Sequence, residues 1–128
     1  MLLFEEESGK ILRACMNVFN ELGNGFLEAV YQEALAVEFK EMEIPYLREA
    51  KINIYYRGRK LNKEYYADFI CYNEIIVELK CVSHIVNAHK AQVINYLHGT
   101  KKKVGLLVNF GESSLKWERL TYLAGEGR

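Results

Sequence analysis

The stretch that decides the fold is YYADFICYNEIIVELK, residues 65–80, in which two apolar runs flank the turn residues Asn73–Glu74. This pattern predicts a buried β-hairpin. Asp68, Glu78 and Lys80 lie within the apolar runs, where a protein core ordinarily has aliphatic side chains. Because a buried charge costs several kcal/mol unless it is paired or bound to a metal, these charges need either one another or a cation.

The spacing of the three charges is compatible with both solutions. Glu78 and Lys80 are two residues apart on one strand, so both point to the same face of the sheet. An ion pair from Lys80 to Glu78 or to Asp68 would satisfy them. Alternatively, the two carboxylates would hold Mg²⁺, a hard cation that keeps several waters. Lys80 would then orient or deprotonate a water and stabilise charge on a phosphate.

The hairpin loop decides whether the two carboxylates can share a metal. With a two-residue loop, Asp68 would lie opposite Leu79 and face away from Glu78, because a one-residue slip flips every side chain. A three-residue loop, Tyr72 to Glu74, or a β-bulge would instead place Asp68 opposite Glu78. The metal interpretation therefore predicts that irregularity.

Two helices are predicted before the hairpin. The first spans residues 8–22, with Ser8 as N-cap and Gly23 as stop. The second spans residues 25–43 and ends before Pro45. Its apolar arc is predicted to contain Phe26, Leu27, Val30, Tyr31, Ala34, Leu35 and Met42.

From Tyr46 the hydrophobic period changes from helical to alternating. Strands are predicted over residues 46–56, 63–72 and 75–81, with a turn at 57–62. A helix over residues 87–99, with Asn87 as cap and Gly99 as stop, leads to strands over 103–110 and 115–123. The order α-α-β-β-β-α-β-β predicts a mixed α/β fold, as a single domain over residues 1–128.

The composition of the chain limits its expected cellular location and binding partners. Lys plus Arg and Asp plus Glu number 17 each, so net charge does not favour a polyanion and nucleic-acid contacts must rest on local patches. The 3 cysteines are odd in number and form no CxxC, which favours a reducing cytoplasm over disulfides or zinc. No apolar run approaches the roughly 20 residues that span a membrane. The acidic start MLLFEEESGK is unlike a signal peptide.

Several segments of the sequence together resemble a known nuclease group. Asp68, nine residues, Glu78, one residue and Lys80 match the pattern of the PD-(D/E)XK nuclease superfamily, although Ala67 stands where that pattern has proline. The segments GFLEAVY, HKAQVINYL and GLLVNFG are similar to those of its GxxExxY family. The matching residues are Gly25, Glu28 and Tyr31 in the first segment and His89, Gln92 and Tyr96 in the second. The resemblance covers residues 8–123.

The resemblance implies a restriction-endonuclease-like core, αβββαβ, here with an additional N-terminal helix and a C-terminal strand. It also implies that the central hairpin holds the active site. Asp68 and Glu78 would bind Mg²⁺ or Mn²⁺, helped by the backbone carbonyl of Leu79. Lys80 would position the attacking water and stabilise the charge of the transition state.

Five further residues receive candidate roles. Gln92 and Tyr96 are similar to a Gln-x-x-x-Tyr helix that supports the catalytic lysine and contacts the nucleic-acid strand. Glu28 is similar to a first-helix carboxylate that completes such metal sites, but its position would also favour the helix macrodipole. Tyr31 would either support the site or fill the core. His89 would contact phosphate or metal, or cap its helix.

Two basic clusters could track a phosphate backbone: Lys101–Lys103, and the group Arg57, Arg59, Lys60 and Lys63. Neither is interleaved with aromatic residues densely enough to predict stacking on a single strand.

The sequence thus predicts a metal-dependent nuclease, with DNA favoured over RNA by analogy alone. The alternative is a catalytically inactive PD-(D/E)XK domain that binds nucleic acid or a protein partner. A homodimer is compatible with a nuclease of this size, since two sites would give two cuts.

Overall fold

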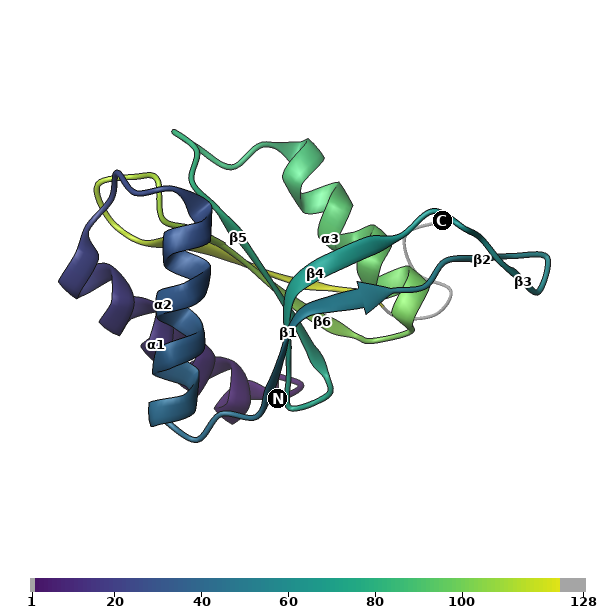
Figure 1. Cartoon of the computed structure of the whole chain (residues 1–128), viewed down its shortest axis with the longest axis horizontal. Coiled ribbons are helices and arrows are strands. Elements are labelled where there is room, and N and C mark those ends of the chain that lie inside the picture. Colours follow the sequence, from purple (N-terminus) through teal and green to yellow (C-terminus); the bar gives the residue numbers. More distant parts are fainter. Residues whose placement is uncertain (1, 123–128) are drawn as a thin grey trace.

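The computed structural model describes residues 2–122. Its helices are α1 (Glu5–Leu22), α2 (Glu28–Glu41) and α3 (Asn87–Thr100). Its strands are β1 (Tyr46–Ile52), β2 (Tyr55–Tyr56), β3 (Arg59–Lys60), β4 (Tyr65–Cys71), β5 (Ile75–Lys80), β6 (Val104–Asn109) and β7 (Lys116–Thr121). The predicted α/β order is confirmed, with the short β2–β3 hairpin as an addition (Figure 1). The predicted end of the last strand at Leu123 lies outside the described residues.

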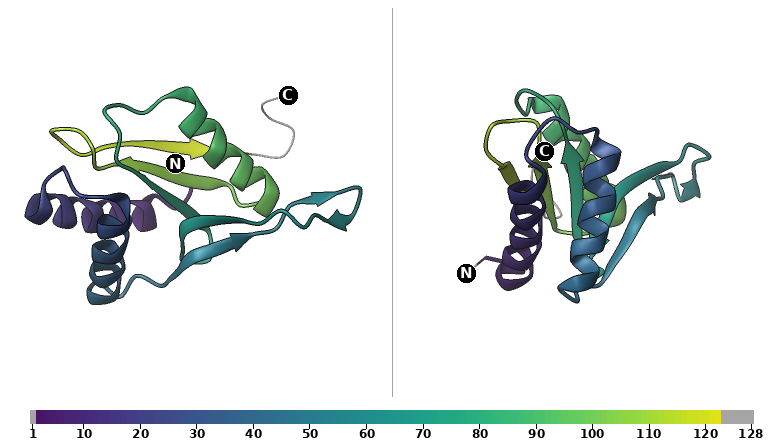
Figure 2. Two further views of the ribbon diagram at one scale, coloured as in Figure 1. Left: turned by 45° about the horizontal axis from the view of Figure 1, so that its top comes forward. Right: turned by 60° about the vertical axis from the view of Figure 1, so that its left-hand side comes forward.

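Helices cover both faces of a five-stranded sheet with the strand order β1-β4-β5-β6-β7. Neighbouring strands are antiparallel except β5 and β6, which are parallel and are connected through α3. Helices α1 and α2 lie on one face and α3 on the other, as Figures 1 and 2 show. Because both faces are covered, β5 and β6 read as continuous apolar runs: Val77 packs toward α1 and α2, and Ile76 toward α3. None of the helices in residues 2–122 has the length and apolarity that a membrane crossing requires.

The start of α1 differs from the prediction. The helix begins at Glu5, so Ser8 is not its N-cap but lies buried in the first turns. The Ser8 hydroxyl has no hydrogen-bond partner among residues 2–122. The three glutamates of residues 5–7 explain the earlier start, because negative charge is favourable at a helix N-terminus. The predicted stop is confirmed, since Gly23 follows the helix with φ 66°.

Helix α2 is shorter than predicted at both ends, and its buried face is narrower. It ends at Glu41, ahead of Pro45, and begins at Glu28. Its buried residues are Tyr31, Leu35, Ala36 and Phe39. Three residues assigned to the apolar arc, Phe26, Leu27 and Val30, are exposed instead. The arc prediction was wrong there because Phe26 and Leu27 precede the helix and therefore do not follow its period.

Both predicted ends of α3 are also corrected. Val86 is the cap residue and Asn87 is already helical, while the helix continues through Gly99 to Thr100. Gly99 serves packing rather than termination, because a Cβ atom there would lie 2.9 Å from Cδ1 of Ile54. The glycine thus lets the end of α3 approach the segment that follows β1.

The long strand predicted over residues 46–56 is interrupted. Strand β1 stops at Ile52, and the predicted turn at 57–62 is the tip of a hairpin made by β2 and β3. Arg57 and Gly58 form its turn with φ values of 53° and 75°, the left-handed geometry of a tight hairpin. This β2–β3 arm extends away from the rest of the chain in Figures 1 and 2.

The β4–β5 hairpin has the three-residue loop that the metal interpretation predicts. Cys71 pairs with Ile75, which leaves residues 72–74 as the loop. Tyr72 and Asn73 have φ values of 56° and 58°, and the Glu74 amide donates to the Cys71 carbonyl at 3.0 Å. In this register Asp68 lies opposite Glu78.

Candidate active site

Asp68 and Glu78 lie where strands β4 and β5 separate. The strand pairing continues only to Phe69 and Val77, although β5 itself runs on to Lys80. In the opening, Glu78 Oε1 accepts a hydrogen bond of 2.7 Å from the Asp68 amide. Asp68 Oδ2 in turn accepts one of 2.8 Å from the Leu79 amide. The two carboxylates thus replace hydrogen bonds of the sheet, which explains how an apolar hairpin tolerates them.

The environment of Glu78 favours a cation. Glu78 is only 6% exposed. Burial, followed by the negative charge of Asp68, raises the pKa of Glu78 to about 8, against the opposing effects of the Asp68 amide and the Lys80 charge. In this surrounding a negative Glu78 needs compensation, either by a proton or by a bound positive ion.

The donor atoms at the opening fit a hard divalent ion. Asp68 and Glu78 offer carboxylate oxygens, the ligands of Mg²⁺ and Mn²⁺, and such ions bind through one or two carboxylates while keeping waters. Among the side chains of residues 2–122, no three His, Cys, Asp or Glu gather closely enough to form a metal site by themselves. The candidate ligand set is therefore the Asp68–Glu78 pair, with its backbone neighbours and waters.

Lys80 does not form the ion pair that the sequence left open. It is half-buried at the end of β5, and its charge lowers the pKa of Glu78. The ion pairs within residues 2–122 are instead Lys51–Glu64 at 2.6 Å and Lys90–Glu118 at 3.7 Å. The Lys80 ammonium thus influences Glu78 without forming an ion pair with either carboxylate.

Gln32 belongs to the site and was not predicted. Its Nε2 donates to Asp68 Oδ1 at 2.8 Å, and its Oε1 accepts from Arg48 Nε at 2.8 Å. Because the Arg48 guanidinium can only donate, it fixes which end of the amide faces Asp68. The available signal in the sequence was spacing, since Gln32 lies four residues after Glu28 and so on the same side of α2.

Glu28 and Tyr31 stand at the entrance of α2 in different roles. Glu28 is the exposed first residue of the helix, close enough that its charge adds to the raised pKa of Glu78. Tyr31 is fully buried, stacks on Phe110 at 4.6 Å, donates to the Gly23 carbonyl, and accepts from the amide of Phe26 at 3.3 Å. Tyr31 therefore anchors the loop that leads to Glu28. Its role lies in the core and not in contact with the carboxylates.

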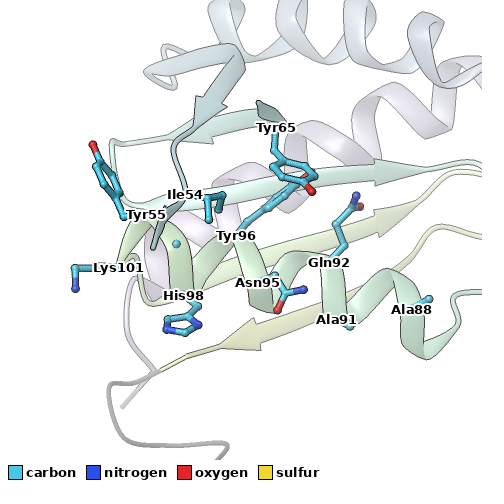
Figure 3. A pocket seen from close by; sticks show the side chains of 11 residues that line it. Ile54, Tyr55, Tyr65, Ala88, Ala91, Gln92, Asn95, Tyr96, His98 and Lys101 are labelled. Atoms are coloured by element: carbon cyan, nitrogen blue, oxygen red, sulfur yellow. The ribbon is translucent and has the colours of Figure 1, made fainter. Parts of the chain in front are cut away.

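Helix α3 brings one predicted residue to the carboxylates. Tyr96 is buried, and burial together with the charges of Glu78 and Asp68 raises the pKa of Tyr96 to about 12. Its ring lies 6.2 Å from that of Tyr65. Gln92 lies beside these two tyrosines along a groove (Figure 3).

His89 is engaged at the start of its own helix. Its Nδ1 accepts a hydrogen bond of 3.1 Å from the Val86 amide, which caps α3. Of the two roles left open by the sequence, the structure therefore contains the capping one. Nε2 then carries the proton in a neutral ring.

Comparisons with known proteins agree with this arrangement. A sequence model of the PD-(D/E)XK nuclease superfamily matches residues 5–120. No curated protein matches the chain. The crystal structure of SSO0001 is similar in fold, with a TM-score of 0.61 and 18% identity, over 92% of this chain and 60% of that one. The chain thus spans only part of the length of that relative. From the match over residues 5–120, the chain belongs to the PD-(D/E)XK nuclease superfamily.

Proposed function

We propose that this protein is a metal-dependent nuclease that hydrolyses phosphodiester bonds, with DNA favoured over RNA. Membership of the superfamily suggests a nuclease-like function, and its nucleases are generally dependent on divalent metals. The observation that carries the proposal is the opening between β4 and β5, where Asp68 and Glu78 meet with hydrogen-bonded carboxylates. A purely structural hairpin has no need of a buried glutamate beside a second carboxylate that repels it.

Asp68 and Glu78, with the backbone carbonyl of Leu79, are the residues that would hold Mg²⁺ or Mn²⁺. When bound, such an ion supplies Lewis acidity and lowers the pKa of coordinated water. Lys80 stabilises negative charge on the phosphate and orients the water that attacks it. The products would be a 5′-phosphate and a 3′-hydroxyl, as the resemblance implies.

The other residues act on these groups. Gln32 holds the Asp68 carboxylate in one orientation through its 2.8 Å hydrogen bond. Glu28 lies at the entrance and would bind the ion through a water, since its charge reaches Glu78 without joining the hydrogen-bonded pair. Gln92 and Tyr96 would contact the substrate from α3, and we assign His89 to the support of that helix.

The finer assignments rest on analogy and on the thiols. Gly25, with φ 112°, Glu28 and Tyr31 support placement in the GxxExxY family, because each has a distinct structural task at the start of α2. Cys15, Cys71 and Cys81 are free thiols, which supports a reducing cytoplasm as the location.

The decisive experiment is calorimetric titration with Mn²⁺. The protein is expected to bind the ion, and Asp68→Ala is expected to abolish binding, whereas the control Glu64→Gln removes an exposed carboxylate without effect. Cleavage of DNA and RNA by the same proteins then tests the chemistry. Absence of Mn²⁺ binding, both alone and with a DNA duplex present, would contradict the proposal.

A second candidate function, a non-catalytic binding module, is favoured by one observation. Phe26, Leu27 and Val30 are 48%, 77% and 37% exposed next to Glu28. Such neighbouring apolar side chains suit a partner surface, and in a homodimer a second copy would cover them. Light scattering of the protein and of Leu27→Glu tests this, since a dimer that uses this surface should dissociate in the variant.

A further inference from the structure

The neutral net charge leaves open how the protein would grip a substrate. The structure contains a groove between α3 and the base of the β2–β3 arm, with a volume of about 720 Å³. Its lining includes Tyr55, Tyr65, Gln92, Asn95, His98 and Lys101. In Figure 3, Tyr55 and Lys101 lie toward one end of the groove and Gln92 toward the other.

We infer that this groove binds a single strand of nucleic acid and leads it from the β2–β3 arm to the Asp68–Glu78 opening. The inference rests on the proposed function and names its substrate more closely. Bases would stack on the tyrosine rings, the amides of Gln92 and Asn95 would contact base edges, and Lys101 would contact phosphate.

The chemistry of the lining selects this ligand. Tyr55 and Tyr65 are 60% and 40% exposed, so both leave aromatic surface open at the groove. Every base offers a π-face to such rings, and amide side chains recognise base edges. The lining residues include Lys101 and His98 but no Asp or Glu, which complements a phosphate backbone.

The groove reaches strand β4, which also carries Asp68 of the candidate active site. Tyr65 begins strand β4, and Asp68 lies three residues further along it, at about 10 Å by the rise of a strand. Tyr96 links the groove to the carboxylates. It lines the groove with its ring 6.2 Å from that of Tyr65, and the charges of Glu78 and Asp68 act on its hydroxyl. A strand on the tyrosines would therefore present its next phosphates to the opening.

The arm supplies the positive charge that the groove needs at its far end. Arg57, Arg59, Lys60 and Lys63 are all exposed on or beside the β2–β3 hairpin. The sequence predicted no stacking surface at this cluster, because the aromatic residues that line the groove come from different elements, with Tyr55 from β2 and Tyr65 from β4. Their proximity is a product of the fold, helped by the close approach of Gly99 to Ile54.

A duplex suits this groove less well than a single strand. In a duplex the bases are stacked on one another, so the rings and amides of this groove could reach them only after unpairing, at a cost of a few kcal/mol. Duplex binding without unpairing rests mainly on contacts to phosphates, for which the groove itself offers only Lys101 and His98.

The test is binding of fluorescein-labelled oligothymidylate by the whole protein in EDTA, followed by anisotropy, so that cleavage cannot interfere. The single strand is expected to bind at least about 10-fold more tightly than a duplex of the same length. Tyr55→Ala and Tyr65→Ala should each weaken binding by about 5- to 150-fold. Tyr55→Phe, which keeps the ring, should retain most of the affinity. Lys101→Ala should make the decline of log affinity with log salt concentration less steep, by about 0.7 in slope.

The chain offers a matched control in Tyr56. It is the neighbour of Tyr55 on the same strand, is 63% exposed, and does not line the groove. Tyr56→Ala should therefore change affinity less than about 2-fold, because successive strand residues face opposite sides. Equal losses in Tyr55→Ala and Tyr56→Ala would overturn the inference, as would equal binding of duplex and single strand or no binding by the native protein.

The outcome is separable from that of the proposed function. Mn²⁺ binding lost in Asp68→Ala reports on the metal site alone, whereas oligonucleotide binding in EDTA reports on the groove alone. A protein that binds the strand but never Mn²⁺ would support the groove and contradict the nuclease. Oligouridylate in place of oligothymidylate distinguishes RNA from DNA, and tight binding of either single strand supports the inference.

Discussion

The molecule contains two hairpins whose charged residues differ in sign and in exposure to solvent. The β4–β5 hairpin buries Glu78, which is 6% exposed, beside the half-buried Asp68, and both carboxylates accept backbone hydrogen bonds. The β2–β3 hairpin exposes basic residues in water, and one of them, Arg57, lies 5.9 Å from the Tyr56 ring. Both turn through left-handed residues, Tyr72 and Asn73 in the first and Arg57 and Gly58 in the second.

The difference teaches how much a charge says about function. A solvated lysine or arginine costs almost nothing to keep, so a basic hairpin by itself is weak evidence for a phosphate ligand. A buried carboxylate beside a second one is costly, and hydrogen bonds, a proton or a cation must offset that cost. The buried hairpin therefore carries the proposed function, and the exposed hairpin acquires meaning only through the groove beside it.

The largest effect is expected at Lys80. Lys80→Ala should lower DNA cleavage by about 100- to 1,000-fold, because a charged donor to the transition state is lost. The same change in the exposed hairpin, Lys60→Ala, should lower it only a few-fold. Steady-state cleavage in Mn²⁺ measures both, and calorimetry should show that Lys80→Ala still binds the ion. Similar losses in the two variants would remove the contrast between the hairpins.

Glu78 makes stability dependent on pH in a direction that is unusual for a carboxylate. Its pKa of about 8 in the folded protein lies above its ordinary value of 4.5, so the folded state binds more protons between these values. The contribution of Glu78 to the free energy of unfolding should then be greatest below about pH 4.5 and should fall as pH rises toward 8. The difference is on the order of 4 kcal/mol by linkage.

Urea unfolding in EDTA across this pH range measures the effect of Glu78. Glu78→Gln should flatten the profile and stabilise the protein at pH 8, by analogy with a protonated carboxyl that never ionises. Mn²⁺ should restore stability to the native protein there, and it should bind more tightly as pH rises because Glu78 must lose its proton. In the exposed hairpin region Glu64, paired with Lys51, has its pKa lowered, so Glu64→Gln should leave the slope between pH 4.5 and 8 unchanged.

A smaller loss is expected when Gln32 is changed. Gln32→Leu keeps the size of the side chain but removes the hydrogen bond to Asp68, so Mn²⁺ affinity or cleavage should fall by about 10- to 100-fold. Gln92→Leu, which changes an amide on the groove side, should weaken oligonucleotide binding while leaving Mn²⁺ affinity intact. Calorimetry and anisotropy on both variants separate the two roles, and a Gln32→Leu protein with native Mn²⁺ affinity would exclude Gln32 as a positioning residue.

The sequence predicted the geometry of the β4–β5 hairpin because that geometry depends on local features. The cost of placing Asp68 and Glu78 in apolar strands could be read from residue types. A metal shared by the two required a three-residue loop or a β-bulge, and the structure has the loop. The order of helices and strands followed from hydrophobic period in the same way. Resemblance then supplied roles that spacing alone left open, and of these the structure brings Tyr96 near the carboxylates while His89 caps α3.

What could not be predicted depends on segments distant in sequence. Gln32 reaches Asp68 across 36 positions of the chain, and no local pattern shows that its amide turns inward. The groove combines β2, β4 and α3, so its rings look unrelated in the sequence. Ser8 and Phe26 were misjudged for a different reason, since helix starts depend on a balance of small terms that electrostatics and loop packing decide.

The smallest predicted effect compares the two turns directly. Asn73 and Gly58 both have left-handed φ values, 58° and 75°, which alanine adopts at a cost of about 1 kcal/mol. Asn73→Ala should lower the global free energy of unfolding by about that amount, because β4 and β5 are central strands of the sheet. Gly58→Ala should leave global stability unchanged and only loosen the arm, since β2 and β3 pair with each other and not with the sheet.

Two measurements distinguish these outcomes. The urea midpoint reports the global change, and amide exchange at Tyr55 and Lys60 reports opening of the arm. Gly58→Asn serves as the control, because asparagine tolerates the left-handed region and should restore the protection. If Gly58→Ala lowered the urea midpoint as much as Asn73→Ala does, the arm would unfold together with the sheet. The two hairpins would then differ in charge and exposure but not in stability, and the arm side of the groove would be as stable as the sheet.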